Sequence, residues 1–174
     1  MFDKSDYIIE ISKLVKGSNE FDIEVDKTLF DNFECEDVLD VKAKIHINAI
    51  KNERFIEINF AFNGEIKVEC SRCLSEMAVK INKKTSLYVK FGEKFEEVDI
   101  NEWIVDINDN NLDLTNYIYE ELRVEIPIAP VHKHKEDCNK EMLEKLSSIN
   151  EENNRKKENE IDPRWAKLAE LKNN

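Results

Sequence analysis

Glycine and proline are scarce in this sequence, with three residues of each among 174. Neither a G-x-G-x-x-G nor a G-x-x-x-x-G-K-[ST] motif occurs, which excludes the glycine-rich loops that bind phosphate groups. No apolar run approaches the roughly 18 residues of a membrane span, and the first dozen residues lack the basic start and apolar run of a signal peptide. We therefore expect a cytoplasmic protein that does not associate with membranes.

Basic residues are also few, with 26 Lys and Arg against 38 Asp and Glu, so the formal net charge is -12. This charge opposes general adhesion to nucleic acid or anionic lipid, and any RNA contact must be local. The exception is 71–94, where six bases and two acids give a balance of +4. Its bases, Arg72, Lys80, Lys83, Lys84, Lys90 and Lys94, predict either a phosphate-contacting ribbon or a solvated sheet face.

Most of the chain is patterned as short strands. Strict alternation of apolar and polar residues from Val41 to Ala49 predicts a half-buried strand. Apolar residues on both sides of Asn63-Gly64 predict a hairpin with a three-residue loop at 62–64. Further strands are predicted at 7–14, 21–30, 77–81, 87–91 and 98–107. The fold class is therefore α+β, with an antiparallel sheet that is partly barrel- or sandwich-like.

Helical spacing begins after the strands. Leu114, Ile118 and Leu122 repeat every four residues, and Asp113 is suited to cap the helix that they predict. We divide the chain into a β-rich body with one helix at about 113–126, a His/Cys segment with a short helix packed on that body, a polar linker or exposed helix, and a tethered amphipathic helix. The four parts span 1–130, 131–149, 150–160 and 161–174.

Cys70 and Cys73 are separated by two residues, which is the spacing of half a tetrahedral zinc site. Further ligands are available in one later cluster, formed by His132, His134 and Cys138. From spacing alone, the pair either holds zinc or consists of two small hydrophobic residues near a sheet edge. A redox-active pair is disfavoured, because a predicted hairpin rather than a helix start surrounds the cysteines.

No catalytic constellation stands out. Residues 95–126 hold ten acids and one base, a pattern more typical of a hydrated face than of a glycosidase pair. His46 falls on the polar side of a predicted strand and is expected to face solvent. Cys35 lies among acidic neighbours that raise a thiol pKa, and we assign it no role. The sequence therefore predicts a protein that is not an enzyme.

Four motifs occur in order along nearly the whole chain. They are Cys-x-Arg-Cys-Leu at 70–74, Ile-Pro-x-x-Pro at 126–130, Asp-Cys at 137–138 and Asp-Pro-Arg-Trp-Ala-x-Leu-x-x-Leu at 162–171. In this order they resemble the YceD family, the large ribosomal RNA subunit accumulation proteins. The sequence departs from the family's Pro-Leu-Cys, since Pro-Val-His stands at 130–132, and it lacks the Cys-Pro-x-Cys-Gly stretch.

The resemblance implies a non-enzymatic factor that supports 23S ribosomal RNA accumulation and large-subunit assembly. It favours one structural zinc ion on Cys70, Cys73, His132 and Cys138, with His134 as alternative ligand. The expected partner is large-subunit ribosomal RNA precursor or a large-subunit ribosomal protein, and the expected partner-binding residues of the terminal helix are Arg164, Trp165, Leu168 and Leu171. The alternative is an acidic interaction module or chaperone-like clamp that holds a basic ribosomal protein without touching RNA.

Overall fold

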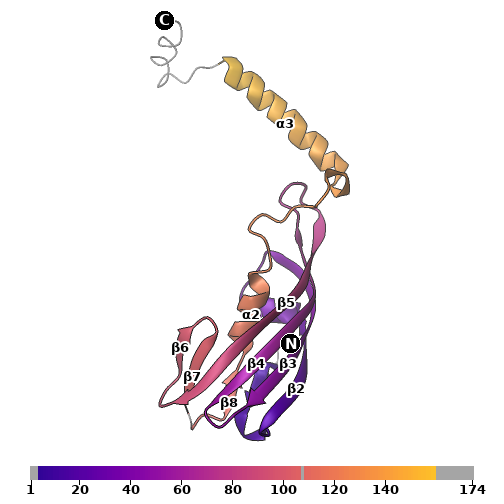
Figure 1. Cartoon of the computed structure of the whole chain (residues 1–174). Coiled ribbons are helices and arrows are strands. Elements are labelled where there is room, and N and C mark those ends of the chain that lie inside the picture. The colour runs from indigo at the N-terminus through magenta and orange to yellow at the C-terminus, as the bar shows by residue number, and fades with distance from the viewer. Residues whose placement is uncertain (1–3, 107, 160–174) are drawn as a thin grey trace, which may run out of the picture. The chain divides into compact units, whose positions relative to one another are not determined.

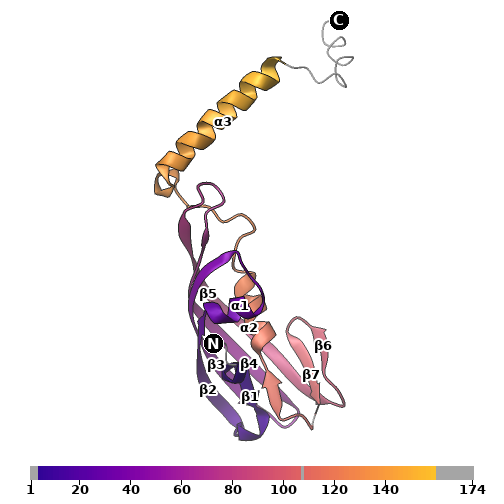
Figure 2. The ribbon, with the colours of Figure 1, turned by 180° about the vertical axis from the view of Figure 1, so that it is seen from behind.

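A computed structural model describes residues 4–106 and 108–159, with side chains described as far as residue 150. The chain divides into two compact units, and each is described by itself. The first comprises the described residues up to Glu69 together with Glu76–Pro130, and the second comprises Cys70–Ser75 and the described residues from Val131 onward. Figure 1 labels most elements of both units, and α1 (Lys27–Asn32) and β1 (Ile8–Glu10) are labelled in Figure 2.

The first unit is built on a six-stranded sheet of mixed α+β architecture, which confirms the predicted fold class. Its strands, in spatial order, are β2 (Gly17–Asp26), β3 (Val38–Lys51), β4 (Phe55–Glu69), β5 (Glu76–Gly92), β7 (Glu102–Asp106) and β6 (Glu96–Asp99). Every neighbouring pair is antiparallel except β5 and β7. Within the described residues β2 and β6 are separate edges, so the sheet is open and does not close into a barrel.

Strand β3 shows why the sheet has one buried face. From Val41 to Ala49 the apolar residues are buried while Lys42, Lys44 and His46 between them are exposed, as the alternation predicts. His46 lies on the solvent face, where its Nδ1 is 3.0 Å from a carboxylate oxygen of Asp22 on the neighbouring strand. The expectation of a solvent-facing histidine is confirmed.

Helices and a small ribbon cover the other face of the sheet, as Figure 2 shows from behind. The covering elements are α1 (Lys27–Asn32), α2 (Thr115–Arg123) and the ribbon of β1 (Ile8–Glu10) paired with β8 (Asn111–Asp113). Their apolar residues join those of β2 to β5 and β7 in one hydrophobic cluster. Burial of this continuous apolar surface is the main source of the unit's stability.

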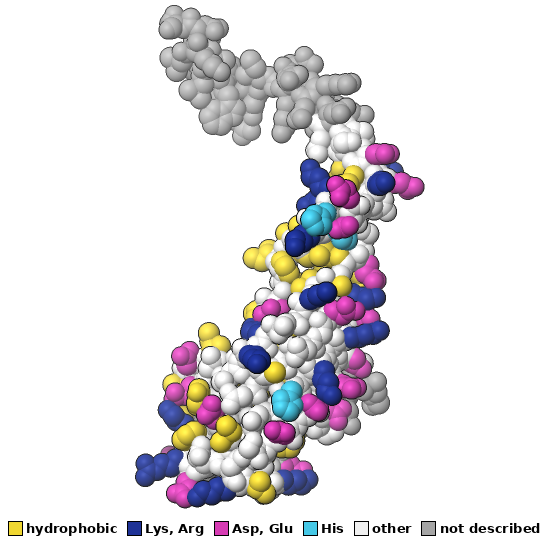
Figure 3. Space-filling model, turned by 45° about the vertical axis from the view of Figure 1, so that its right-hand side comes forward, with side chains coloured by type: hydrophobic (Ala, Val, Ile, Leu, Met, Phe, Trp, Pro, Cys, Tyr) yellow, Lys and Arg dark blue, Asp and Glu magenta, His cyan; other side chains and the backbone are white. Residues whose placement is uncertain are grey.

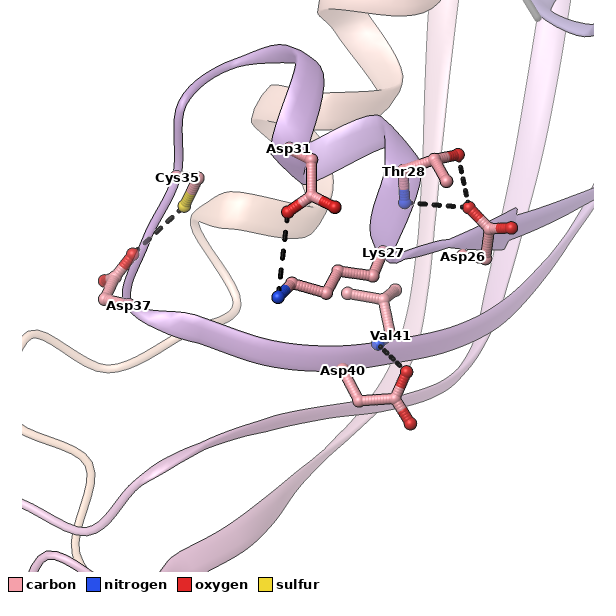
Figure 4. Close-up of polar contacts among 8 residues, drawn as sticks. All are labelled: Asp26, Lys27, Thr28, Asp31, Cys35, Asp37, Asp40 and Val41. Atoms are coloured by element: carbon pink, nitrogen blue, oxygen red, sulfur yellow. Dashed lines mark hydrogen bonds and ion pairs between the residues drawn. The ribbon is translucent and has the colours of Figure 1, made fainter. Parts of the chain in front are cut away.

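The predicted strand at 21–30 is wrong in its second half, because β2 ends at Asp26 and α1 follows. The Asp26 carboxylate accepts a hydrogen bond from the Thr28 backbone N–H at 2.8 Å (Figure 4), which caps the helix. Lys27 and Asp31 then pair one turn apart at 3.7 Å. An N-capping aspartate in the middle of the apolar pattern thus ends the strand.

The predicted strand at 7–14 is likewise only partly a strand. The extended segment is limited to β1, and a 3₁₀ turn at Ile11–Lys13 follows it. Strand β2 begins at Gly17, four residues before the predicted start at residue 21. The chain therefore changes direction before Gly17.

The predicted hairpin at Asn63-Gly64 is also wrong, since β4 continues through both residues without a turn. Gly64 pairs with Ala43 of β3, and a Cβ at Gly64 would collide with the Lys42 carbonyl oxygen and the Ala43 Cα. Glycine is needed at this position because the backbones of β3 and β4 approach each other closely, as happens at some glycines inside sheets. The hairpin turns instead lie at 52–54 and 70–75.

The remaining elements follow the predicted pattern with shifted boundaries. The two strands expected at 77–81 and 87–91 are one strand, β5, and the segment expected at 98–107 belongs to the hairpin of β6 and β7. In α2 the residues of the four-residue repeat are fully buried. The N-cap of α2 is Leu114, one residue after the predicted Asp113, and it makes no side-chain cap bond. The Asp113 carboxylate, just ahead of it, accepts from the Thr115 N–H at 3.0 Å.

The second unit contains the loop 70–75, a 3₁₀ turn at Lys135–Asp137 and helix α3 (Lys140–Asn159). The Asn139 side chain accepts from the Met142 N–H at 3.3 Å and caps α3. Of the two alternatives for the polar stretch after Asn150, the structure has the helix, which continues through Asn159. The amphipathic helix expected at 161–174 lies outside the described residues. No helix that is described has the length and apolarity required to cross a membrane.

Candidate metal centre

Cys70 and Cys73 lie in the tight loop that joins β4 to β5. The loop is closed by two backbone hydrogen bonds, from the Cys70 N–H to the Ser75 carbonyl at 2.9 Å and from the Leu74 N–H to the Cys70 carbonyl at 2.8 Å. Leu74 has φ +57°, a left-handed conformation that is rare for a branched residue. The loop is thus curled tightly enough for both sulfurs to point to one side.

The other two candidate ligands come from the segment that follows Pro130. His132 and Cys138 flank the 3₁₀ turn at Lys135–Asp137, and the turn is closed by hydrogen bonds from the Asp137 N–H to the His134 carbonyl and from the Cys138 N–H to the Lys135 carbonyl. The turn reverses the chain so that Cys138 returns beside His132. His134, the alternative ligand, is exposed and does not belong to the cluster.

Cys70, Cys73, His132 and Cys138 lie together, with all four potential ligand atoms within 4.8 Å of one another. The His132 Nδ1 is 3.6 Å from the Cys73 sulfur and 3.7 Å from the Cys138 sulfur. A tetrahedral zinc ion with usual bond lengths separates a sulfur and a nitrogen ligand by roughly 3.6 Å. The two distances from His132 match this separation, and the cluster as a whole is compatible with a metal site.

Hydrogen bonds favour the thiolate form in the loop 70–75. Burial by itself raises the pKa of Cys73, but donation to its sulfur from the Ser75 hydroxyl and from the backbone of Ser75 and Asn139 lowers that pKa to about 6. The pKa of Cys70 is lowered in the same way, because three backbone amides of the cluster outweigh the effect of burial. Thiolates are the form that binds metal, so this loop is prepared for it.

The opposite shift occurs at the fourth ligand. Burial raises the pKa of Cys138, and the neighbouring Cys73 raises it further. His132 has a raised pKa, chiefly because it hydrogen-bonds to Cys70. Three sulfurs so close together repel one another once they are charged, and a divalent cation is what would balance them. Arg72 supplies a smaller compensation, with its guanidinium 3.6 Å from the Cys138 sulfur.

A cluster of this composition would give a closed site. Three thiolates and one imidazole complete a four-coordinate shell, which leaves no position for an activated water or a substrate. The cysteines are nearly inaccessible to solvent, with exposed fractions of 0%, 2% and 4% for Cys70, Cys73 and Cys138. The arrangement is suited to holding the polypeptide together and not to catalysis.

The basic residues predicted to contact RNA do not share one face. Lys80 and Lys84 lie on the exposed outer face of β5, opposite Glu65 and Ala61 of β4. Lys83 projects to the other face. Lys90 pairs with Glu102 at 2.6 Å, Lys94 is exposed in the loop after β5, and Arg72 belongs to the cysteine loop.

Lys83 is held by α2 and by the residues just after it. Its Nζ is 2.7 Å from Glu121 and 3.3 Å from Glu125, and only 25% of the Lys83 side chain is exposed. The alternation along β5 indicates that Lys83 points to the buried face, because it lies an even number of positions from the buried Ile81 and Leu87. Its charge is therefore already compensated within the unit.

Sequence reasoning missed two lysines on the same outer face. Lys42 and Lys44 of β3 are exposed on the outer face of the sheet, where Glu65 lies between Lys42 and Lys80 in the register. The alternation of β3 indicates that both lysines face solvent. Their position on the same face as Lys80 and Lys84 follows from the pairing of β3 with β4, which was not predicted. Basic and acidic side chains are interspersed over the surface seen in Figure 3.

The other predicted residues are Arg164, Trp165, Leu168 and Leu171, which lie outside the described residues. Cys35, to which no role was assigned, is buried and donates its S–H to Asp37 at 3.0 Å (Figure 4). Burial, with help from Asp37, raises the pKa of this thiol. Cys35 is thus a protonated core residue.

Comparisons with known proteins identify a family. The model of one protein family, described as "Large ribosomal RNA subunit accumulation protein YceD", matches residues 58–172. No curated protein and no solved structure matches the chain. The matched range includes both arms of the cysteine and histidine cluster.

Proposed function

The chain belongs to the YceD family, and from this premise we propose that it is a non-enzymatic ribosome biogenesis factor that supports 23S ribosomal RNA accumulation. The observation that carries the proposal is the family match over residues 58–172. The closed character of the cysteine and histidine cluster supports a role in assembly over a role in catalysis.

The proposal includes one structural zinc ion on Cys70, Cys73, His132 and Cys138. The distances of 3.6 and 3.7 Å from the His132 Nδ1 to two of the sulfurs support tetrahedral coordination. The ion would hold the loop 70–75 to a segment 59 positions further along the chain. Its role would be to fix the shape of this unit, not to supply chemistry.

RNA contact is proposed for the outer face of the sheet. Lys80 and Lys84 of β5 stand on this face with Lys42 and Lys44 of β3. Asn63 lies on β4 between these two strands, and Asn82 lies on β5 between Lys80 and Lys84. Lysines on a flat polar face are suited to phosphate contacts and amides to sugar and base edges. Lys90 and Lys94 of the same unit would extend this contact, and Arg72 would meet RNA separately from the second unit. Lys83 would serve the fold through its acidic partners.

A crosslinking experiment in the host tests this proposal. The tagged full chain is crosslinked in cells and purified, and RNA and proteins are identified in the same eluate. We expect 23S precursor RNA with the unchanged chain and a loss of most of that RNA with Lys80→Glu and Lys84→Glu together. A matched variant, Lys13→Glu with Lys16→Glu, makes the same charge change at two exposed lysines near the N-terminus and should keep the RNA.

The alternative function is an acidic module that holds a basic ribosomal protein without RNA contact. It is favoured by one observation, the net charge of -12, which complements a basic protein and repels nucleic acid. Recovery of large-subunit proteins without crosslinked RNA would support this alternative. The predicted partner-binding residues Arg164, Trp165, Leu168 and Leu171 would then decide recovery, and deletion of 161–174 would abolish it while the lysine reversals would not.

A further inference from the structure

A cavity of about 320 Å³ lies in the first unit between α2 and the hairpin of β6 and β7. These elements are neighbours in both views of the ribbon (Figures 1 and 2). The cavity is lined by Glu97, Asp99, Ile100, Trp103, Tyr117, Glu120 and Glu121. Its volume is at the small end of the range for ligand pockets, roughly 300–1,000 Å³, so it is large enough for one long side chain.

The aromatic part of the lining is rigid. Trp103 and Tyr117 pack edge to face, with ring centroids 5.7 Å apart and planes at 87°. The Tyr117 hydroxyl is 3.1 Å from the Thr85 hydroxyl and 3.4 Å from the Asn101 side-chain oxygen. This packing and hydrogen bonding hold the floor of the cavity in place before anything binds.

Three of the four lining carboxylates have no ion-pair partner among the described residues. Of the acids that line the cavity, only Glu121 forms an ion pair, with Lys83. Within the described part of the chain, Glu97, Asp99 and Glu120 have no ion-pair partner, and all three are exposed. Residues 95–126 hold ten acids and one base, a net -9 out of -12 for the chain. The cavity therefore lies in the most acidic region.

Apolar side chains border the same cavity. Ile100 lines it and is 77% exposed, and Phe95 and Val98 of the same hairpin region are also more than half exposed. Phe95 contacts Trp103 edge to face at 5.7 Å. Strand β6 is also an edge of the sheet, so one side of its backbone has no strand partner among the described residues. Exposed apolar residues beside a free strand edge are typical of a protein-binding surface.

We propose that this cavity binds an arginine or lysine side chain of a basic, extended segment of a partner protein. The carboxylates would meet the charged group, while the alkyl stem would lie against Ile100 and Trp103. Apolar residues of the segment would cover Phe95 and Val98. An RNA or an anionic lipid is disfavoured here because the lining has the same sign of charge. The inference does not depend on RNA contact at the outer face of the sheet.

Peptide binding to the full chain tests the inference. The probe is a fluorescent peptide of repeated Arg-Leu-Gly units, and the control peptide replaces each arginine with citrulline, which keeps the shape and removes the charge. We expect binding that is at least tenfold weaker for the citrulline peptide. Titration with the arginine peptide should shift the NMR signal of the Trp103 indole N–H first.

Two variants locate the binding. Glu97→Gln, Asp99→Asn and Glu120→Gln together should weaken binding at least tenfold, and Ile100→Ser should weaken it without any change of charge. The matched control removes three exposed acids elsewhere, Glu20→Gln, Glu24→Gln and Glu34→Gln, and should stay within twofold of the unchanged chain. Because all substituted side chains are exposed, each variant should keep the fold, which circular dichroism checks.

Three outcomes would overturn the proposal. Equal weakening by both triple variants would mean that only the general negative charge attracts the peptide. NMR shifts centred away from Trp103 would place the binding elsewhere. Concentration-dependent self-association that the first triple variant abolishes would identify a second copy of the chain as the occupant.

Discussion

Replacement of Gly64 distinguishes the sheet described above from the hairpin that the sequence suggests. In a hairpin turn, Gly64→Asn would be tolerated, because asparagine adopts left-handed turn conformations with little strain. In the observed sheet both Gly64→Ala and Gly64→Asn place a Cβ against the Lys42 carbonyl oxygen and the Ala43 Cα. The neighbour is backbone, so it cannot rotate away.

The magnitude follows from two contributions. Overpacking in a well-packed interior costs about 1–3 kcal/mol, and an L-residue at the Gly64 φ of +156° costs a further ~1–3 kcal/mol. We therefore expect both variants to lose about 2–6 kcal/mol, a large part of the usual ~5–15 kcal/mol of a domain. Gly17→Ala is the matched control, since Gly17 also has a positive φ, +99°, but nothing lies within 4 Å of its Cβ position.

Urea unfolding of the full chain, followed by circular dichroism, measures these differences. Gly17→Ala should lose only the backbone contribution and stay more stable than Gly64→Ala. The reasoning is refuted if Gly64→Asn is as stable as the unchanged chain, or if Gly64→Ala costs no more than Gly17→Ala.

Three further predictions concern the metal cluster and two charged side chains. The purified chain should carry about one zinc ion by elemental analysis. A chelator or Cys73→Ser should lower its melting temperature markedly, since structural zinc contributes on the order of 10 kcal/mol in small peptides. Cys35→Ser should keep the metal, and a metal-free chain of unchanged stability would contradict the site. Lys83→Met should lower the free energy of unfolding by about 1–3 kcal/mol, because it leaves Glu121, only 11% exposed, without its cation. Adding Glu121→Gln should recover part of this loss in chemical denaturation. A loss that Glu121→Gln does not reduce would argue against the ion pair. Burial raises the pKa of Asp113, but contacts from the Lys4 ammonium and the Thr115 amide outweigh burial and leave that pKa below its usual value. The carboxylate therefore stabilises the fold at neutral pH, and this contribution is lost as the pH falls from about 4 through the lowered pKa. Asp113→Asn should be less stable than the unchanged chain at pH 7, and the gap should narrow as the pH is lowered below about 4 in thermal melts; a gap that does not change with pH would remove the charge from the explanation.

Periodicity predicted the parts of the fold that depend on one buried face. The alternation of β3 and the four-residue repeat of α2 are both properties of residues that point into the same core, and both were predicted correctly. Gly64 was misassigned because its neighbour Ala43 is remote in sequence. A pattern within one segment does not show which strand will pass close to it, so close approach cannot be read from local sequence.

The candidate metal site was predictable in part from the sequence. Residue type and spacing indicated Cys70 and Cys73 as a pair, and the family resemblance favoured His132 and Cys138 as the completing residues. Spacing alone did not choose between His132 and His134, because that choice depends on the turn at Lys135–Asp137. The partners of Lys83 were equally hidden, since they depend on how α2 packs against β5.

The order of the metal-site residues along the chain has a consequence for biosynthesis. Cys70 and Cys73 leave the ribosome first, and roughly 65 further residues must be made before Cys138 is available. At about 5–20 residues per second this takes roughly 3–13 s. During that interval the two thiols are without the His132 and Cys138 side chains that surround them in the finished protein. Oxidation or capture of the wrong metal is therefore a greater hazard for the nascent chain than for the folded protein, until Cys138 has also left the ribosome.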